Sequence, residues 1–183
     1  EARGFGYPVR TMDTDWQGNN NLGDRTANVY YTFTYTYDWI IGPKFHATEN
    51  TKLKFDAAIE YEVGSQMGSD DKLAIMVSVD CGQSWEEADV IDQSTGIYPF
   101  LTGYSVSLAD YAGEDVMVAF YATTGETSDT EKFFMHIDDV LIGDFYPVDA
   151  GISALLQPLN PCGFSDEETI EVTVNNYGET AIS

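Results

Sequence analysis

Apolar and polar residues alternate with a period of two along much of this chain, and no long segment repeats its apolar residues at helical spacing. In residues 31–37, aromatic residues and threonines take turns. In residues 52–61, apolar side chains share one face and mostly charged ones fill the other, which predicts a half-buried antiparallel strand. Residues 73–79 again have apolar side chains at every second position, and the segment ends at Asp80-Cys81-Gly82, where glycine favours a tight turn.

Four further segments have strand character, namely 39–41, 104–108, 116–122 and 133–142. With one or two edge strands, the pattern predicts about seven to nine strands separated by turns. The expected fold class is therefore all-β, a two-sheet antiparallel β-sandwich of jelly-roll type. A single closed barrel is the alternative architecture.

The pattern changes near residues 145–149, where Pro147 interrupts it. Beyond this point residues 151–156 and 169–175 predict two new strands, with Ile170, Val172 and Val174 on one face. So short a segment cannot close a sandwich. We therefore expect a jelly-roll domain over residues 1–146, and over 147–183 a linker with the first strands of a second, immunoglobulin-like β-sandwich that is cut off at Ser183.

Charge narrows the range of partners. The chain has 31 acidic and 8 basic residues, a formal net charge of −23 and a pI near 4.1. Such a chain repels a phosphate backbone, which excludes nucleic acid as a partner. Acidity is a solubility device in many exported proteins, and it also serves cation binding where carboxylates cluster.

No stretch approaches the roughly 20 apolar residues of a membrane helix, so we expect no membrane insertion. No signal segment opens the chain, and Glu1 is expected to begin a mature or excised fragment. The cysteines Cys81 and Cys162 do not form a CxxC metal motif. They are either one disulfide bridge or two free thiols.

Five ordered motifs resemble the MAM-like jelly-roll modules of secreted Bacteroidetes proteins, the group that includes cleaved-adhesin and choice-of-anchor domains. They are Asp38-Trp39-Ile40-Ile41-Gly42-Pro43, Leu53-Lys54-Phe55-Asp56-Ala57-Ala58, the run from Val77 to Trp85, Val106-Ser107-Leu108 with Tyr111-Ala112-Gly113, and Ile137-Asp138-Asp139-Val140. The later segments at Asp149-Ala150-Gly151-Ile152 and from Val172 to Gly178 are similar to the opening of an immunoglobulin-like repeat. The resemblance implies an extracellular β-sandwich, frequently calcium-bound, that is attached to proteases, adhesins or other surface proteins and has no chemistry of its own.

The run from Asp13 to Asp24 is the best local candidate for a cation site. Counted as a twelve-residue calcium loop, it has glycine at position six for the sharp turn. The ligands would be side-chain oxygens of Asp13, Asp15, Gln17, Asn21 and Asp24, with the backbone carbonyl of Asn19. Gln17 and Asp24 depart from the usual pattern, and no helices flank the loop. The alternative is a polar surface loop in which the same residues form turns.

Asp138 and Asp139 form the second candidate, at the end of an apolar strand. Neighbouring residues of a strand point to opposite faces, so at most one of these carboxylates is expected to be half-buried. We expect one of them to meet the 13–24 loop at a structural calcium ion. An ordinary cap at a turn is the alternative. Asp56 is a third possible ligand, although its position favours a solvent-facing strand residue.

The chain offers little for catalysis. Its only imidazoles, His46 and His136, lie outside nucleophile-elbow and metalloprotease motifs, and His136 is expected on a strand surface. Glu60 and Glu62 share a strand face at about 7 Å, as a glycosidase pair would, but exposed acids on one face of a sheet are commoner. We expect no enzyme activity in this chain.

The aromatic side chains also allow the hypothesis that the chain binds a saccharide. Most must be core residues in so aromatic a sandwich, and Trp39 and Trp85 are expected to be packing residues. Trp16 in the candidate calcium loop, with Tyr98 and Phe100 in a later loop, are the candidates for stacking on a ligand.

The expected function is therefore a secreted or cell-surface adhesion module with structural calcium, which binds a glycan or a host or matrix protein. The alternative is an accessory structural domain that spaces or stabilises an enzyme, such as a protease, elsewhere in the same polypeptide. In either case further domains of that polypeptide are expected partners.

Overall fold

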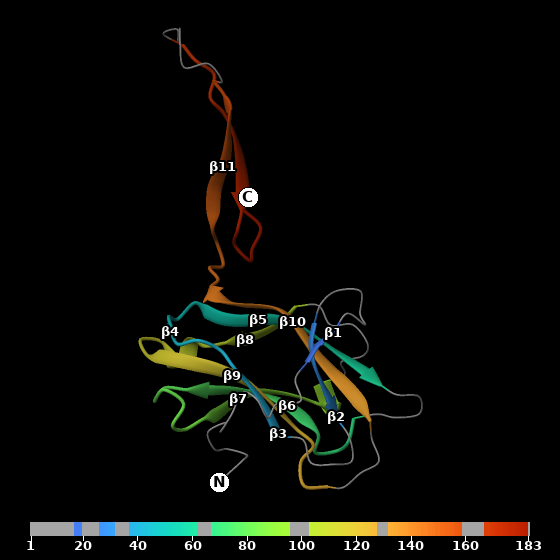
Figure 1. Cartoon of the computed structure of the whole chain (residues 1–183). Coiled ribbons are helices and arrows are strands. Elements are labelled where there is room, and N and C mark those ends of the chain that lie inside the picture. Colours follow the sequence, from blue (N-terminus) through green and yellow to red (C-terminus); the bar gives the residue numbers. More distant parts are fainter. Residues whose placement is uncertain are drawn as a thin grey trace. The chain divides into compact units, whose positions relative to one another are not determined.

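A computed structural model describes residues 17–19, 26–31, 37–61, 67–95, 103–127, 132–158 and 167–182. The chain divides into two compact units, Glu1–Gly143 and Asp144–Ser183 (Figure 1). The sequence pattern had suggested the boundary between residues 146 and 147. Each unit is described below by itself.

Unit 1 contains two antiparallel sheets. The first sheet has the order β1 (Gln17–Asn19), β2 (Thr26–Tyr31), β10 (Phe133–Asp144), β5 (Thr51–Tyr61) and β8 (Tyr104–Ser107). The second sheet has the order β3 (Tyr37–Ile41), β9 (Asp115–Thr123), β6 (Lys72–Ser78) and β7 (Glu86–Asp92), and the short β4 (Phe45–His46) also pairs with β9.

The chain passes repeatedly from one sheet to the other, with β5, β8 and β10 in the first sheet and β4, β6, β7 and β9 in the second. Such crossing connections are typical of a jelly-roll β-sandwich. The all-β sandwich prediction is confirmed, and the two separate sheets replace the single-barrel alternative. Two short 3-10 turns, η1 (Gln93–Thr95) and η2 (Ala109–Tyr111), are the helical elements of the described residues, none of which forms a helix long and apolar enough to cross a membrane.

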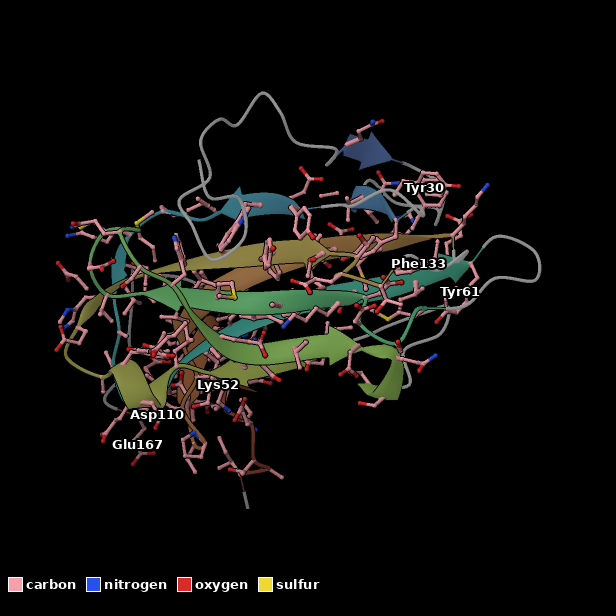
Figure 2. The ribbon with its side chains drawn as sticks, turned by 90° about the horizontal axis from the view of Figure 1, so that it is seen from below. Tyr30, Lys52, Tyr61, Asp110, Phe133 and Glu167 are labelled. Atoms are coloured by element: carbon pink, nitrogen blue, oxygen red, sulfur yellow. The ribbon has the colours of Figure 1, made fainter. Side chains whose placement is uncertain are left out.

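The core lies between the two sheets. The alternation in β5 buries Leu53, Phe55 and Ile59 almost completely, as the sequence predicted. Phe55 meets Phe120 of β9 edge-on, with ring centroids 4.9 Å apart. At one end of unit 1, Phe133 lies against Tyr61, with centroids 5.9 Å apart (Figure 2). The Phe55–Phe120 contact joins the two sheets, the Phe133–Tyr61 contact lies within the first sheet, and both are part of one hydrophobic core.

Strand β6 is buried on both faces, because a second apolar cluster covers the outer face of the second sheet. Its buried members are Ala74, Met76, Trp85, Ala119 and Tyr121. Trp39 stacks on Tyr121 at 4.4 Å and lies 5.5 Å from Trp85, so both tryptophans pack, as expected. The prediction that Val79 belongs to this strand and shares its apolar face was wrong, because Val79 lies beyond the end of β6 and is 50% exposed.

The predicted strand over residues 31–37 is not one strand. Tyr31 ends β2 in the first sheet and Tyr37 begins β3 in the second, while residues 32–36 lie outside the described part. The alternation was real, but the chain changes sheets within it. At the β6–β7 turn, Cys81 and Gly82 have φ angles of 61° and 82°, which fits the predicted tight turn, and Cys81 is a free, exposed thiol. Cys162 lies outside the described residues.

Strand β7 forms one edge of the second sheet. Four of its seven residues are acidic, namely Glu86, Glu87, Asp89 and Asp92. Charged side chains are a common protection for the unpaired backbone groups of an edge strand.

Unit 2 is a two-stranded antiparallel ribbon of β11 (Ala150–Gln157) and β12 (Glu171–Asn176). The register pairs Ile152 with Val174 and Leu155 with Val172, so these four side chains share one face. A register irregularity between Ile152 and Ala154 places Leu155 on this face, whereas strict alternation would place it on the other face. The ribbon is therefore aliphatic on one face, and Ile152, Leu155 and Val174 are 68%, 57% and 60% exposed.

Candidate functional site

A cleft of about 540 Å³ opens between the two sheets of unit 1. Ala27 of β2 and Leu53 of β5 line it from the first sheet, and Ile40 of β3 with Val118 and Phe120 of β9 line it from the second. All five side chains are apolar. The cleft thus continues the hydrophobic core outward to the surface.

The outer wall of the cleft is the last part of β10, which supplies Ile137, Asp138, Asp139, Val140 and Ile142. In a regular strand only alternate residues could line one side. Asp139 has a φ of 48°, in the left-handed region, and this interrupts the alternation. Aspartate adopts that region more readily than most residues other than glycine. Both residues line the cleft, and only Asp138 is half-buried, which agrees with the expectation that at most one of the two carboxylates is half-buried.

Asp138 and Asp139 form an acidic rim on this apolar cleft. Oδ1 of Asp138 accepts a hydrogen bond from the backbone N–H of Asp139 at 2.8 Å, which braces the bend. Asp138 is half-buried and Asp139 is exposed. Within the part of the chain that the structure describes, no cationic side chain pairs with either carboxylate. The rim therefore presents negative charge to whatever enters the cleft.

The wall opposite β10 is the turn after β3, where Gly42 and Pro43 line the cleft. The Gly42 N–H donates to the carbonyl of Val118 at 2.8 Å. A Cβ at residue 42 would lie 3.2 Å from that carbonyl oxygen, so glycine permits this close approach. The turn is thereby held against β9, and Pro43 adds rigidity to the wall.

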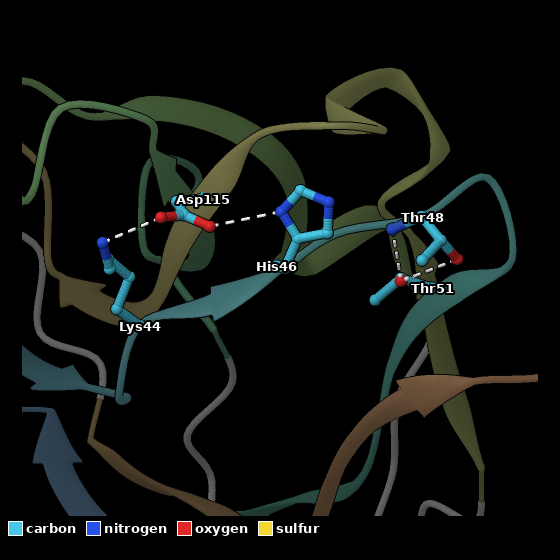
Figure 3. A network of polar contacts seen from close by, with 5 residues as sticks. All are labelled: Lys44, His46, Thr48, Thr51 and Asp115. Atoms are coloured by element: carbon cyan, nitrogen blue, oxygen red, sulfur yellow. Dashed lines mark hydrogen bonds and ion pairs between the residues drawn. The ribbon is translucent and has the colours of Figure 1, made fainter.

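Lys44, which follows this turn, forms an ion pair with Asp115. Nζ of Lys44 lies 2.9 Å from Asp115, whose other oxygen lies 3.2 Å from Nδ1 of His46 (Figure 3). The hydrogen bond to Asp115 raises the pKa of Lys44, and the same bond lowers the pKa of Asp115. Beside it, the Thr48 N–H donates to Oγ1 of Thr51 at 2.8 Å. Lys44 is thus held by Asp115 at the start of β9.

Most residues of the predicted calcium loop lie outside the described residues, namely Asp13, Asp15, Asn21 and Asp24, together with Trp16. Gln17 and Asn19 bound β1, which pairs with β2, and Gln17 is exposed. Asn19 lies opposite Thr26, and the adjoining Ala27 lies opposite Ile137. The register therefore places this part of the loop in the same sheet as the end of β10, two strands away.

The described residues alone do not make a calcium site. They contain no group of three or more His, Cys, Asp or Glu residues that could hold a metal ion. Asp138 and Asp139 supply two carboxylates, whereas calcium takes about six to eight oxygen ligands. Asp56, the third candidate, accepts a hydrogen bond from the Gly103 N–H at 2.7 Å. Calcium binding by this chain stays a prediction.

The other candidates from the sequence are separate from the cleft or untested. Tyr98, Phe100 and Glu62 lie outside the described residues. His46 belongs to the Asp115 network described above. The apolar lining at Ile40, Pro43 and Val140 was not predicted as a site from the sequence, although the unbroken run Val140-Leu141-Ile142 after two acids indicates an interrupted alternation.

The prediction for His136 was wrong, because its ring is only 1% exposed. Nδ1 lies 2.9 Å from the Thr26 hydroxyl, and Nε2 lies 3.2 Å from a Glu60 carboxylate oxygen. Since a carboxylate only accepts hydrogen bonds, Nε2 carries the proton and Nδ1 accepts from Thr26. Burial lowers the pKa of His136, and the bond to Glu60 opposes that shift. Thr26 is also buried, at 6% exposed. Since Thr26 lies in β2, Glu60 in β5 and His136 in β10, this contact joins three strands.

A scan against protein-family models finds no match, and no curated protein matches the sequence. The resemblance to MAM-like modules is therefore not confirmed. Among solved structures, the chain is similar to Caldicellulosiruptor saccharolyticus CBM27-1, solved in complex with mannohexaose. The identity is 11%, the match covers 73% of this chain and 88% of that chain, and the TM-score is 0.45. The fold assignment above rests on the strand order of this chain itself.

Proposed function

We propose that this chain is a non-catalytic ligand-binding module of an extracellular protein, with a protein or glycan as its ligand. The observation that supports this function is the open apolar cleft beside the bend in β10. Its volume of about 540 Å³ lies in the range of binding pockets, which are mostly apolar with a few placed polar groups. The walls are strands and a braced turn, so the site needs little ordering when a ligand binds.

The exposed surface beside the cleft fits this role. Val140 and its neighbour Leu141 are 47% and 55% exposed. Two adjacent exposed aliphatic side chains next to an apolar opening provide area that a ligand can bury. The Thr26–His136–Glu60 contact offers no comparable opening, because the Thr26 side chain and the His136 ring are both buried.

The experiment is a calorimetric titration against panels of glycans and matrix proteins, with variants that alter the cleft alone. Ala27→Phe fills it from β2, and Val140→Ser removes apolar surface from its rim. We expect a ligand of the cleft to bind the natural chain and to bind both variants weakly or not at all. Ala112→Phe, at an exposed residue outside the lining, is the matched control and leaves binding unchanged.

Because Val140 is largely exposed, Val140→Ser keeps the fold even if Ala27→Phe does not. Absence of any ligand in the panels overturns the proposed function. A ligand that binds both cleft variants as well as the natural chain overturns the assignment of the cleft.

A second proposal concerns unit 2, whose aliphatic face supports the accessory-domain alternative. A two-stranded ribbon is only marginally stable in water, and three or more strands with an apolar face are needed for independent stability. The exposed Ile152, Leu155 and Val174 therefore need another layer of β-structure. We propose that residues 147–183 belong to a second β-sandwich of the same polypeptide, so that unit 1 also spaces neighbouring domains.

Structural calcium remains part of the proposal. Its ligands would come from the 13–24 loop, whose strand β1 lies in the same sheet as the end of β10. A bound cation there would fix the edge of the sheet beside the cleft.

A further inference from the structure

We infer that the cleft takes a peptide segment in which an aliphatic side chain stands next to a lysine or arginine. This inference rests on the proposed function, because it names the ligand of the same cleft. It follows from two properties of the site taken together, the apolar lining and the acidic rim.

The lining favours an aliphatic group over a sugar ring. Sugar rings stack on flat aromatic faces, and among the described residues that line the cleft the one aromatic ring is that of Phe120, which is only 5% exposed. The other apolar lining residues are aliphatic, and the largest of them are Ile40, Leu53, Ile137 and Ile142. They bury a leucine- or isoleucine-sized group well and offer few hydrogen bonds to hydroxyls.

The rim favours a positive charge next to that group. Asp138 and Asp139 lie side by side, and no cation of the described residues pairs with them. Lys44, which follows the opposite wall, is held by Asp115. With a net charge of −23, the whole chain also attracts cationic partners and repels anionic ones.

The peptide, not a free cation, is the occupant that uses both properties. Asp138 already accepts a hydrogen bond from the backbone, and the described residues supply no third acidic ligand. An ammonium or guanidinium group needs only one or two carboxylates in hydrogen-bonding range. The apolar part of the peptide would fill the cleft while the cation lies over the rim.

The test uses three fluorescein-labelled eight-residue peptides and the full 183-residue chain in fluorescence anisotropy. The first alternates leucine and lysine, the second replaces each lysine by glutamate, and the third replaces each leucine by serine. We expect binding of the leucine-lysine peptide, weaker binding of the serine-lysine peptide, and none of the leucine-glutamate peptide. The serine-lysine peptide measures attraction by the net charge alone.

The decisive variant is the pair Asp138→Asn and Asp139→Asn. Asparagine also tolerates the left-handed conformation at residue 139, so the bend is kept. We expect the leucine-lysine peptide to bind about tenfold more weakly, because two rim contacts are lost. Asp110→Asn with Glu114→Gln is the matched control, since it removes two exposed acids outside the cleft and changes affinity by less than about twofold.

Equal binding of the leucine-lysine and serine-lysine peptides overturns the inference, as does an unchanged affinity in the Asp138→Asn, Asp139→Asn variant. A neutral glycan that is lost in Val140→Ser but kept in that variant sustains the proposed function and refutes the cationic peptide. If calcium abolishes peptide binding where sodium chloride of equal ionic strength does not, the carboxylates hold the metal and the inference also fails.

Discussion

At the scale of single residues, His136 is a buried imidazole that lies between Thr26 of β2 and Glu60 of β5. Alternation with Met135 and Ile137 places it on the outer face of the first sheet, and such residues are usually exposed. Its contacts to Thr26 and Glu60, 110 and 76 residues away in the sequence, cannot be read from local pattern. A buried imidazole of this kind makes stability depend on pH.

The pKa of His136 is lowered in the folded chain from its ordinary value of 6.5. The unfolded state therefore binds the proton first, and folding stability falls as pH drops below about 6.5 toward the folded pKa. We expect the melting temperature of the natural chain to fall between about pH 7.5 and pH 5.5 more steeply than that of His136→Gln. Thermal unfolding followed by circular dichroism measures both.

Glu60 provides the control for this pH effect, because its hydrogen bond raises the pKa of His136 against the larger effect of burial. Glu60→Gln therefore lowers the folded-state pKa of His136 further, so the loss of stability still begins near pH 6.5 but becomes larger and continues to lower pH. Acid also reduces the self-repulsion of a chain with net charge −23, which acts in the opposite direction in all variants. Identical pH profiles for the natural chain and His136→Gln would contradict the prediction.

Asp80 gives a second pH dependence, at the β6–β7 turn. Hydrogen bonds from Ser84, first through its hydroxyl and then through its backbone N–H, and from the hydroxyl of Ser78 lower its pKa to about 2. Its contribution is present above the unfolded pKa of 3.8 and is lost as pH falls through about 2. We expect Asp80→Ala to lower the melting temperature near pH 6, with a difference that shrinks toward pH 2.

Asp110→Ala is a suitable comparison, since this exposed acid lies in another turn. It controls for the loss of one negative charge from an exposed turn. A constant difference between natural chain and Asp80→Ala from about pH 6 to pH 2 would show that Asp80 acts through something other than its charge.

At the scale of the strands, alternation identified the elements but not their surroundings. It marked β5 and β6 correctly, yet it could not show that β6 is covered on both faces, because the second cover comes from Trp39, Trp85 and Tyr121. Nor could it show that Val79 lies beyond the end of β6. Strand ends depend on turn geometry, which the sequence defines only loosely.

The pair Val77 and Val79 tests this boundary with one kind of substitution. Val77 is 1% exposed and Val79 is 50% exposed. We expect Val77→Ala to cost about 2 kcal/mol and to lower the melting temperature by roughly 4–8 °C. Val79→Ala should stay within about 0.5 kcal/mol of the natural chain. Equal costs in chemical denaturation would contradict the boundary.

The cleft shows the same limit of local pattern. The sequence predicted a strand over residues 133–142 and singled out Asp138 and Asp139, but the bend between them depends on one backbone angle. The opposite wall at Ile40 and Pro43 belongs to a different sheet. Sheet order and crossing connections are long-range properties, and so the candidate residues could be found while the cleft that unites them could not.

The ribbon of unit 2 offers a test of its exposed aliphatic face. Ile152→Thr with Val174→Thr should reduce binding of the dye 1-anilinonaphthalene-8-sulfonate, because both side chains are exposed. The stability of unit 1 should change by less than about 0.5 kcal/mol. Thr173→Ala with Asn175→Ala alters the polar face and should leave the dye signal unchanged. Equal dye binding by both double variants would contradict an aliphatic face.

At the scale of the whole chain, structural calcium is the prediction with the widest effect. A cation that binds only the native state stabilises it by about 2.7 kcal/mol at a hundredfold excess over its Kd. We expect EDTA to lower the melting temperature and calcium to restore it. Asp138→Asn with Asp139→Asn then reports whether β10 supplies ligands, since the calcium effect shrinks only if it does.

Magnesium and sodium chloride are the controls, because a net charge of −23 allows any salt to stabilise the chain by screening. A melting temperature that EDTA leaves unchanged would end the calcium prediction. Equal stabilisation by magnesium, or by sodium chloride of the same ionic strength, would assign the effect to screening.

The acidic edge strand β7 governs how copies of the sandwich meet in concentrated solution. A second copy adding its own β7 there would bring the carboxylates of Glu86, Glu87, Asp89 and Asp92 against a like set. At neutral pH this repulsion keeps the open edge from acting as a template for strand addition. Acid that protonates the four groups removes the barrier while leaving the backbone edge intact, so the same strand that keeps copies apart at neutral pH favours strand addition in acid.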